Sequence, residues 1–133
     1  MALTDDQKQW LAEHTLAVLA TGKRDGSPQV STIYYGWDGR HAYISVTSDR
    51  AKWKNAMRNP NVALLVPDGR RQLIAYGTAE GITDPDERDR WSIWLREQRG
   101  AEVPADRAAF RAELDAANRV ILKITPERAF KND

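Results

Sequence analysis

The sequence contains no cysteine and only two histidines, and these absences exclude several kinds of chemistry. Disulfides, thiolate nucleophiles and cysteine-ligated zinc sites all require cysteine sulfur. Neither His14 nor His41 forms a metal-type cluster with carboxylates, whereas a metal site needs several convergent ligands. We therefore expect no metal site, and we interpret both histidines as structural or exposed residues.

Long apolar segments and an excess of one charge are also absent. No apolar run approaches the roughly 20 residues of a membrane-spanning helix, and residues 1–10 are too polar for a signal peptide. The net charge of +1 provides no general attraction to nucleic acid or to a membrane surface. The 133 residues, 41% of them hydrophobic, are typical of one domain with its own core. We expect a single domain over residues 1–133 in the cytoplasm, where a protein without cysteine fits the reducing conditions.

Common nucleotide-binding and hydrolase motifs are missing as well. No G-x-G-x-x-G or P-loop motif follows a predicted strand, and no serine lies in a nucleophile elbow. The acidic residues between positions 84 and 89 are typical of a helix start and not of a catalytic pair. The sequence therefore does not predict a Rossmann enzyme or an NTPase.

The hydrophobic periodicity predicts helices and strands in the order α, β-β-β, α, β-β, α-α, β. Asp38-Gly39 is typical of a tight hairpin turn, and strands joined by such turns run antiparallel. Six strands of this length tend to close on themselves, so we expect a mainly β, α+β fold with an antiparallel six-stranded barrel. The helices are expected over residues 5–14, 49–59, 84–99 and 104–117, the strands over 15–21, 29–37, 40–47, 62–66, 72–82 and 119–125, and a polar tail over 126–133.

The helix predicted over residues 49–59 begins with an unusual pattern of charge. Ser48 or Asp49 can cap it, but Arg50 and Lys52 fall in the first turn, where the helix dipole favours acids. An anion bound between the two cations would explain their position, because helix N-termini and Arg or Lys side chains commonly bind phosphate together. The alternative is a solvated helix whose charges fall there by chance.

Hydroxyl groups gather on the two strands before this helix. If the strands over 29–37 and 40–47 pair through the Asp38-Gly39 turn, these polar side chains flank the start of the basic helix. A flat heterocycle bound there would have its phosphate at Arg50 and Lys52; the alternative is ordinary strand residues facing water. The hydroxyl-bearing residues are Ser31, Thr32, Tyr34 and Tyr35 on the first strand and Ser45 and Thr47 on the second.

Six short motifs follow one another along the chain: LAVLATG at 16–22, DGSPQVS at 25–31, YISVT at 43–47, RAKWKN at 50–55, NPNVAL at 59–64 and GTAEG at 77–81. Together with RVILKITP at 119–126, their order and spacing resemble the pyridoxamine-phosphate-oxidase-like split β-barrel flavoproteins. Within that family they are most similar to the deazaflavin-dependent reductases of actinobacteria, which use coenzyme F420. Residues 84–117 are less diagnostic.

The resemblance implies an FMN-binding-like split barrel and a homodimer with two cofactor sites at the subunit interface. The residues implied to contact the cofactor are Arg50 and Lys52 at its phosphate, Ser31, Thr32, Ile33, Val46 and Thr47 along its ring, and Asn55, which matches the motif. A deazaflavin also carries an acidic glutamyl tail, and basic residues that could line its path are Lys54, Arg58, Arg70 and Arg71.

Two departures from the true pyridoxamine-phosphate oxidases bear on the activity. Ala51 separates Arg50 from Lys52, as in the deazaflavin branch, and the C-terminal Arg/His substrate motif of those oxidases is missing. The resemblance therefore implies an F420H2-dependent oxidoreductase that transfers a hydride to an unsaturated or conjugated acceptor of quinone, enone lactone or tetrapyrrole type. Solvent, Tyr34 or Tyr35 would supply the proton.

Three other functions remain open at this point. One is an FMN-dependent oxidoreductase of the same fold, and another is a non-catalytic protein that binds or carries F420. The third is a small barrel that binds single-stranded nucleic acid, against which the near-zero net charge argues.

Overall fold

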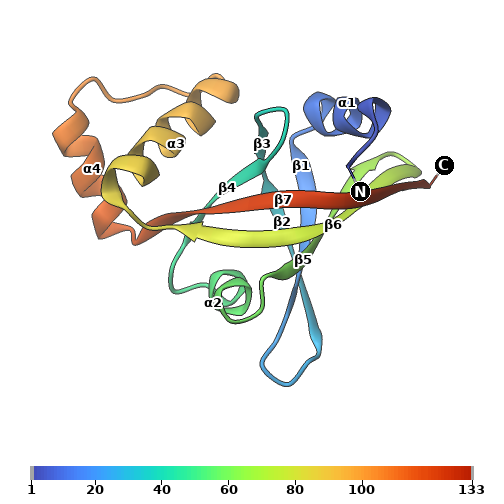
Figure 1. Cartoon of the computed structure of the whole chain (residues 1–133). Helices are drawn as coiled ribbons and strands as arrows, with labels where there is room; N and C mark the ends of the chain where they lie inside the picture. The colour runs from blue at the N-terminus through green and yellow to red at the C-terminus, as the bar shows by residue number, and fades with distance from the viewer. Residues whose placement is uncertain (1, 133) are drawn as a thin grey trace.

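One antiparallel sheet forms the body of the protein in a computed structural model that describes residues 2–132 (Figure 1). Over these residues the sheet has seven strands in the order β2-β1-β5-β6-β7-β4-β3. The strands are β1 (Leu16–Gly22), β2 (Pro28–Tyr34), β3 (Gly36–Trp37), β4 (Ala42–Thr47), β5 (Asn61–Asp68), β6 (Arg71–Ile82) and β7 (Arg119–Asn132). The helices are α1 (Asp5–Glu13), α2 (Ala51–Arg58), α3 (Pro85–Gln98) and α4 (Arg107–Ala116).

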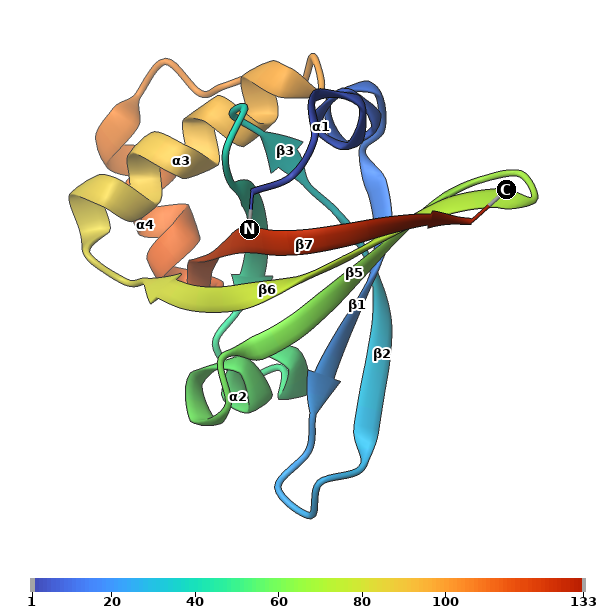
Figure 2. The same cartoon turned by 45° about the vertical axis from the view of Figure 1, so that its right-hand side comes forward.

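The sheet curls into a half-barrel, and the helices cover different parts of it (Figures 1 and 2). Helix α1 lies near the β5–β6 hairpin, whereas α2 lies at the opposite end, between β4 and β5. Helices α3 and α4 lie together outside β4 and β7. The expected α+β class and antiparallel pairing are therefore confirmed. None of the described helices is long and apolar enough to cross a membrane.

Alternating side chains give the sheet its apolar interior. Along β5, Val62, Leu64 and Val66 are buried, while the residues between them are more exposed, as the period of two in a strand requires. On β4, Ile44 and Val46 face the same interior, and Tyr43 faces outward, where it stacks on Trp91 of α3 with ring centroids 3.8 Å apart. One face of strand β4 thus lies in the barrel core, and its other face packs against helix α3.

The strand predicted over 29–37 is two strands, so the expected count of six was wrong. The chain turns at Tyr35, whose N–H donates to the Thr15 carbonyl at 2.9 Å and whose hydroxyl donates to the Leu11 carbonyl at 2.8 Å. Strand β2 pairs with β1, whereas β3 pairs with β4 through Gly36 and Trp37 only. The hydrogen bonds of Tyr35 hold this bend, and no local sequence pattern reports them.

The polar tail predicted over 126–133 was also wrong for its described residues, which continue β7 as far as Asn132. Strand β6 is long enough to pair with this whole segment, from Ile82↔Ile121 to Gln72↔Asn132, with a bulge between Tyr76 and Gly77. Contacts from helix α1 and from β6 anchor the segment: Lys131 bonds Asp6, and Phe130 meets Tyr76 edge to face. Most residues of β7 from Pro126 onward are exposed and several are charged, which is why the sequence pattern of this segment is that of a tail.

Candidate functional site

Helix α2 begins without a side-chain cap. The N-cap is Arg50, not Ser48 or Asp49 as predicted, and no side chain accepts a hydrogen bond from the first turn. The Asp49 carboxylate instead bonds the hydroxyl of Thr47, and this bond lowers the pKa of the Asp49 carboxyl. The first turn contains no acidic residue, so no carboxylate of α2 compensates its unbonded N–H groups or the positive end of its dipole.

Three basic side chains gather at this uncapped end. Partial burial lowers the pKa of the Lys52 ammonium, and the positive charges of Arg50 and Arg119 lower it further. Arg119 reaches this position because β7 pairs with β4 so that Arg119 lies opposite Thr47. Within residues 2–132, none of the three cations forms an ion pair with a carboxylate. The neighbouring Asp49 carboxylate interacts with the charge of Arg50 but forms no close ion pair with it. A cluster of like charges without an ion-pair partner is typical of an anion-binding site.

Arg119 was not among the predicted site residues. Its only signal in the sequence is a basic residue at the start of the last predicted strand, and many strands begin with one. Its position beside Arg50 and Lys52 follows from the pairing of β7 with β4, two segments about 70 residues apart in the chain. The sequence alone does not reveal this pairing.

Three of the predicted ring contacts lie on β2, an edge strand. In the described part of the sheet β2 pairs only with β1, so one side of Ser31, Thr32 and Ile33 has backbone groups with no strand partner. The Ile33 side chain is in the core, and that of Thr32 is exposed. The Ser31 hydroxyl is buried and has no hydrogen-bond partner among residues 2–132, which is uncommon for a buried polar group.

The other two predicted ring contacts lie at the end of β4. Val46 is buried in the core and Thr47 is half-buried on the outer face. Beyond Tyr43, the side of β4 away from β7 has no described strand partner. Ser31 and Thr47 therefore do not lie on paired strands, as the hairpin model predicted; they lie on strands near the two ends of the curled sheet.

Asn55 of α2 connects the helix to β1 and β2. Its side chain is buried, and its amide nitrogen donates to Thr21 Oγ1 at 3.2 Å and to Gln29 Oε1 at 2.9 Å. Its amide oxygen accepts from Arg58 Nη2 at 2.9 Å. These bonds set the position of α2, and with it Arg50 and Lys52, relative to the strand that carries Ser31.

The tyrosines predicted as proton donors differ in exposure. Burial raises the pKa of Tyr35, whose hydroxyl already donates to the Leu11 carbonyl, so this residue is structural. Tyr34 is 70% exposed and faces away from the core.

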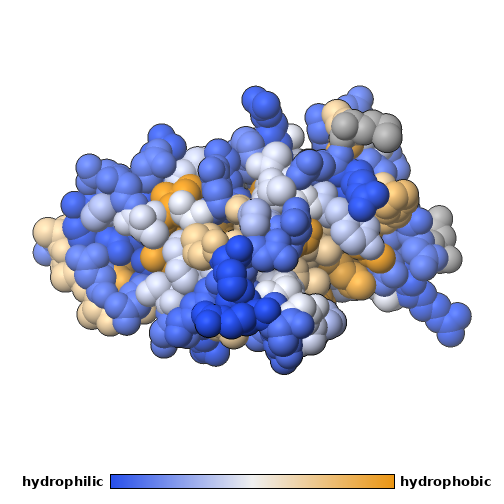
Figure 3. All heavy atoms as spheres, turned by 60° about the horizontal axis from the view of Figure 1, so that its bottom comes forward, coloured by the Kyte–Doolittle hydropathy of each residue, from blue (hydrophilic) through white to orange (hydrophobic). Residues whose placement is uncertain are grey.

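The basic residues predicted along a coenzyme tail do not share one surface. Arg58 bonds the Gly22 carbonyl and Asn55 beside α2, whereas Arg71 lies over the Trp10 ring at the α1 end of the barrel. Figure 3 brings the side that carries α2 forward and shows strongly hydrophilic residues gathered there. Of the four predicted residues, Lys54 and Arg58 alone are close to the cation cluster in sequence and belong to the same helix.

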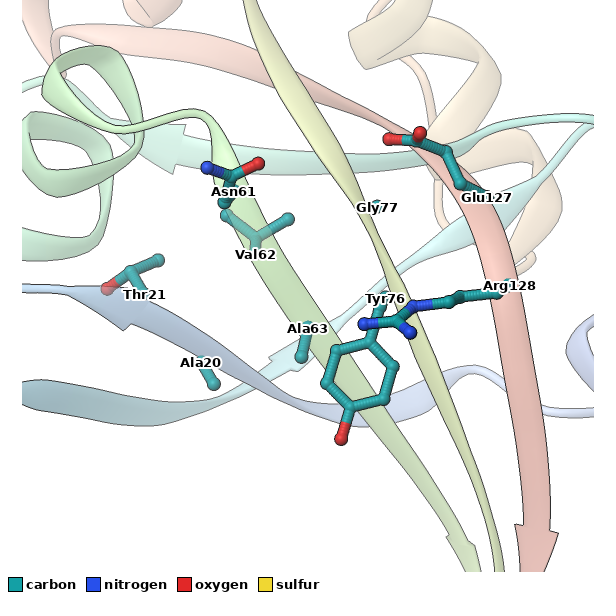
Figure 4. A pocket seen from close by; sticks show the side chains of 9 residues that line it. All are labelled: Ala20, Thr21, Asn61, Val62, Ala63, Tyr76, Gly77, Glu127 and Arg128. Atoms are coloured by element: carbon teal, nitrogen blue, oxygen red, sulfur yellow. The ribbon is translucent and has the colours of Figure 1, made fainter. Parts of the chain in front are cut away.

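A separate open groove of about 620 Å³ lies on the surface of β1, β5, β6 and β7 (Figure 4). Its main side chains are Tyr76, which is 39% exposed, and Arg128, whose guanidinium lies 5.0 Å from the Tyr76 ring centre. The groove contains no cluster of like charges and no buried unpaired polar group, in contrast to the α2 site.

A family model described as pyridoxamine 5'-phosphate oxidase matches residues 3–133. The chain belongs to this family. Its members include oxidoreductases and proteins that bind flavin-type cofactors, and the half-barrel of this chain is of the kind found in the family.

Solved structures extend the comparison. A structure titled F420 reductase is 28% identical, with 92% of this chain and 94% of that chain covered and a TM-score of 0.71. Conserved hypothetical protein Rv2991 from Mycobacterium tuberculosis is 21% identical, with a TM-score of 0.80 and coverage of 100% and 86%. An FAD-binding protein from Mesorhizobium loti is 24% identical, with a TM-score of 0.69 and coverage of 95% and 91%. At these identities the second and third comparisons show the shared fold alone.

Proposed function

We propose that this protein is an F420H2-dependent oxidoreductase that acts as a homodimer on an unsaturated or conjugated acceptor of quinone, enone lactone or tetrapyrrole type. The observation that carries the proposal is the cluster of Arg50, Lys52 and Arg119 at the uncapped start of α2. The F420 reductase among the structural relatives, at 28% identity, favours a deazaflavin over a flavin.

The residues present fit such a coenzyme. The first-turn N–H groups of α2 and the three cations would hold its phosphate, because they supply hydrogen-bond donors and positive charge at one place. The unpaired Ser31 hydroxyl and the open backbone edges of β2 and β4 would hydrogen-bond the polar edge of its ring. When bound, a reduced deazaflavin supplies a hydride, and the protein supplies orientation and electrostatics.

The same residues explain how the chain would orient the ring. The side chains of Ile33 and Val46 pack in the core, and this packing fixes the backbone groups of β2 and β4 near them. Asn55 holds α2 against β1 and β2, which keeps the phosphate end and the ring end at a constant separation. A proton for the acceptor would come from solvent or from the exposed Tyr34, since Tyr35 is buried and engaged.

In the proposed homodimer, exposed apolar side chains of the sheet would form the contact between subunits. The outer face of β2 exposes Val30 and Tyr34, which are 64% and 70% exposed, and the surface of β6 and β7 exposes Tyr76 and Phe130. Apolar side chains of this kind on sheet surfaces are typical of subunit contacts.

Titration of the purified protein with F420 and, separately, with FMN tests the proposal. We expect tighter binding of F420, and we expect Lys52→Ala to weaken it roughly ten- to hundredfold, the loss of about 1.5–3 kcal/mol typical of one charge-assisted hydrogen bond. Lys8→Ala on α1 is the matched control, because α1 lies at the opposite end of the half-barrel from α2 and its cation cluster. Oxidation of F420H2 with a quinone would then separate an enzyme from a carrier.

An FMN-dependent oxidoreductase of the same fold is the second candidate, because the family model that matches the chain is that of an oxidase. A preference for FMN in the paired titration would select this candidate, and binding of neither coenzyme would refute both.

A further inference from the structure

A second cavity lies between the half-barrel and helix α3, and it shares Arg119 and Tyr34 with the site described above. Its volume is about 770 Å³, within the range of roughly 300–1,000 Å³ typical of small-molecule sites. One wall is a single face of α3 that continues to its C-cap, formed by Ser92, Leu95, Arg96 and Arg99 at positions i, i+3, i+4 and i+7. The opposite wall includes Trp37 of β3 and Ser45 of β4.

The cavity is strongly one-sided in charge. Three arginines line it, namely Arg96, Arg99 and Arg119, and none of its described lining residues is acidic. Arg96 is held in place, since its guanidinium lies 4.7 Å from the Phe110 ring centre and donates to the Glu102 carbonyl. Arg99 and Arg119 form no ion pair within residues 2–132, so their charges remain available to an anion.

The polar group that points to a ligand is the Ser92 hydroxyl. Ser92 is 4% exposed, and its Oγ is buried without a hydrogen-bond partner. A buried hydroxyl that bonds nothing destabilises a fold, so its presence in the middle of a helix needs another explanation. Arg99 lines the same cavity about two turns further along this face of α3, and a carboxylate bound by its guanidinium would offer the Ser92 hydroxyl the acceptor that it lacks.

Two further features define the ligand. Aromatic rings line the cavity, among them Tyr34 and the half-buried Trp37, so its body would be flat and apolar. The last carbonyls of α3 are already bonded by the N–H groups of Arg99, Gly100 and Ala101, which reduces the repulsion that a helix C-terminus would exert on an anion.

From these observations we infer that the cavity between α3 and the half-barrel is a binding site for a planar aromatic carboxylate. Arg99 and Ser92 hold the carboxylate, and the aromatic body lies against Trp37. This site goes beyond the proposed function and does not depend on it, because carboxylate binding requires no coenzyme.

Isothermal titration of the coenzyme-free protein with 2-naphthoate and with neutral 2-naphthamide tests the inference. The acid is expected to bind at least about tenfold more tightly than the amide, and Ser92→Ala and Arg99→Gln are each expected to raise its Kd about tenfold. Arg90→Gln is the matched control, since Arg90 is an exposed arginine of the same helix outside the cavity. F420 titration of the two cavity variants is expected to match the unaltered protein, so the two proposals can fail separately.

Thermal denaturation adds a readout that separates a ligand-binding serine from a structural one. Ser92→Ala removes an unsatisfied buried hydroxyl, so the melting temperature of the empty protein is expected to rise while naphthoate binding weakens. Equal affinity for acid and amide, no saturable binding of the acid, or unchanged affinity in both cavity variants would overturn the inference.

Discussion

Replacement of Asn55 by alanine distinguishes two roles that the sequence could not separate. The resemblance places Asn55 among the cofactor contacts, but the structure buries its amide and gives each end a protein partner. If the role is to hold α2 against the barrel, the variant loses stability first. If the amide binds the coenzyme, the variant loses affinity and keeps its stability.

The expected loss of stability follows from the bonds. Asn55→Ala removes the two donor bonds at 2.9 Å and 3.2 Å and the bond at 2.9 Å that its amide oxygen accepts from Arg58. Three net hydrogen bonds at about 0.5–1.5 kcal/mol each, with the partly exposed bond to Arg58 at the lower end, give about 2–4 kcal/mol. For a chain of this size that corresponds to a melting temperature lower by about 6–20 °C.

Urea denaturation and F420 titration of the same preparations measure both quantities. We expect a lower urea midpoint for Asn55→Ala with an unchanged slope, and a smaller change in F420 affinity than Lys52→Ala produces. A double-mutant cycle with Gln29→Ala should show coupling of about 0.5–3 kcal/mol, because the two side chains share a bond. An unaltered urea midpoint combined with a tenfold or larger rise in the F420 Kd would refute the structural role.

Three further predictions concern stability. Gly77→Ala places a Cβ 2.1 Å from the Thr125 carbonyl oxygen of β7, so we expect the free energy of unfolding to fall by at least about 3 kcal/mol in thermal denaturation. A variant as stable as the original would contradict the geometry of the bulge. Burial lowers the pKa of His14, but hydrogen bonds to a carbonyl of α1 and to Asp68 outweigh burial, so the pKa is raised. The contribution of His14 to stability is therefore full below the unfolded pKa of about 6.5 and is lost as the pH rises through the folded pKa. Unfolding free energies between pH 5 and 9 test this, and Asp68→Asn should flatten the profile. Arg88 is 5% exposed and donates to Asp115 and to the Arg119 carbonyl. We therefore expect Arg88→Met to lower the unfolding free energy measured in urea by about 3–5 kcal/mol. A loss below about 1 kcal/mol would show that these bonds contribute little to stability.

Elements with strong local signals could be predicted from the sequence. The Thr4 capping box begins α1, and Asp84 followed by Pro85 begins α3, as their motifs indicate. Both signals act within a few residues, where hydrogen bonds to the first turn decide the outcome. The hypothesis of an anion site rested on a similarly local pattern, since Arg50 and Lys52 lie two residues apart at one helix start.

Features that depend on distant pairing could not be predicted. The bend at Tyr35 depends on carbonyls of Leu11 and Thr15, and β7 extends to Asn132 because β6 is there to pair with it. Arg119 joins the anion site only through the register of β7 on β4. Loop lengths and residue preferences contain no information on such registers, which are fixed by packing of the whole sheet.

The places where this chain breaks local rules coincide with its two candidate sites. Helix α2 has an arginine at its N-cap and no acid in its first turn, whereas α3 follows the usual capping pattern. The two buried hydroxyls without partners among the described residues belong to Ser31, on the edge strand β2, and Ser92, in the α3 cavity. A sequence selected only for stability would cap that helix and replace both serines by apolar residues, because each departure costs free energy in the empty protein. Two ligands, one at each site, would offset these costs by neutralising the cations and by accepting the unpaired hydroxyl hydrogens.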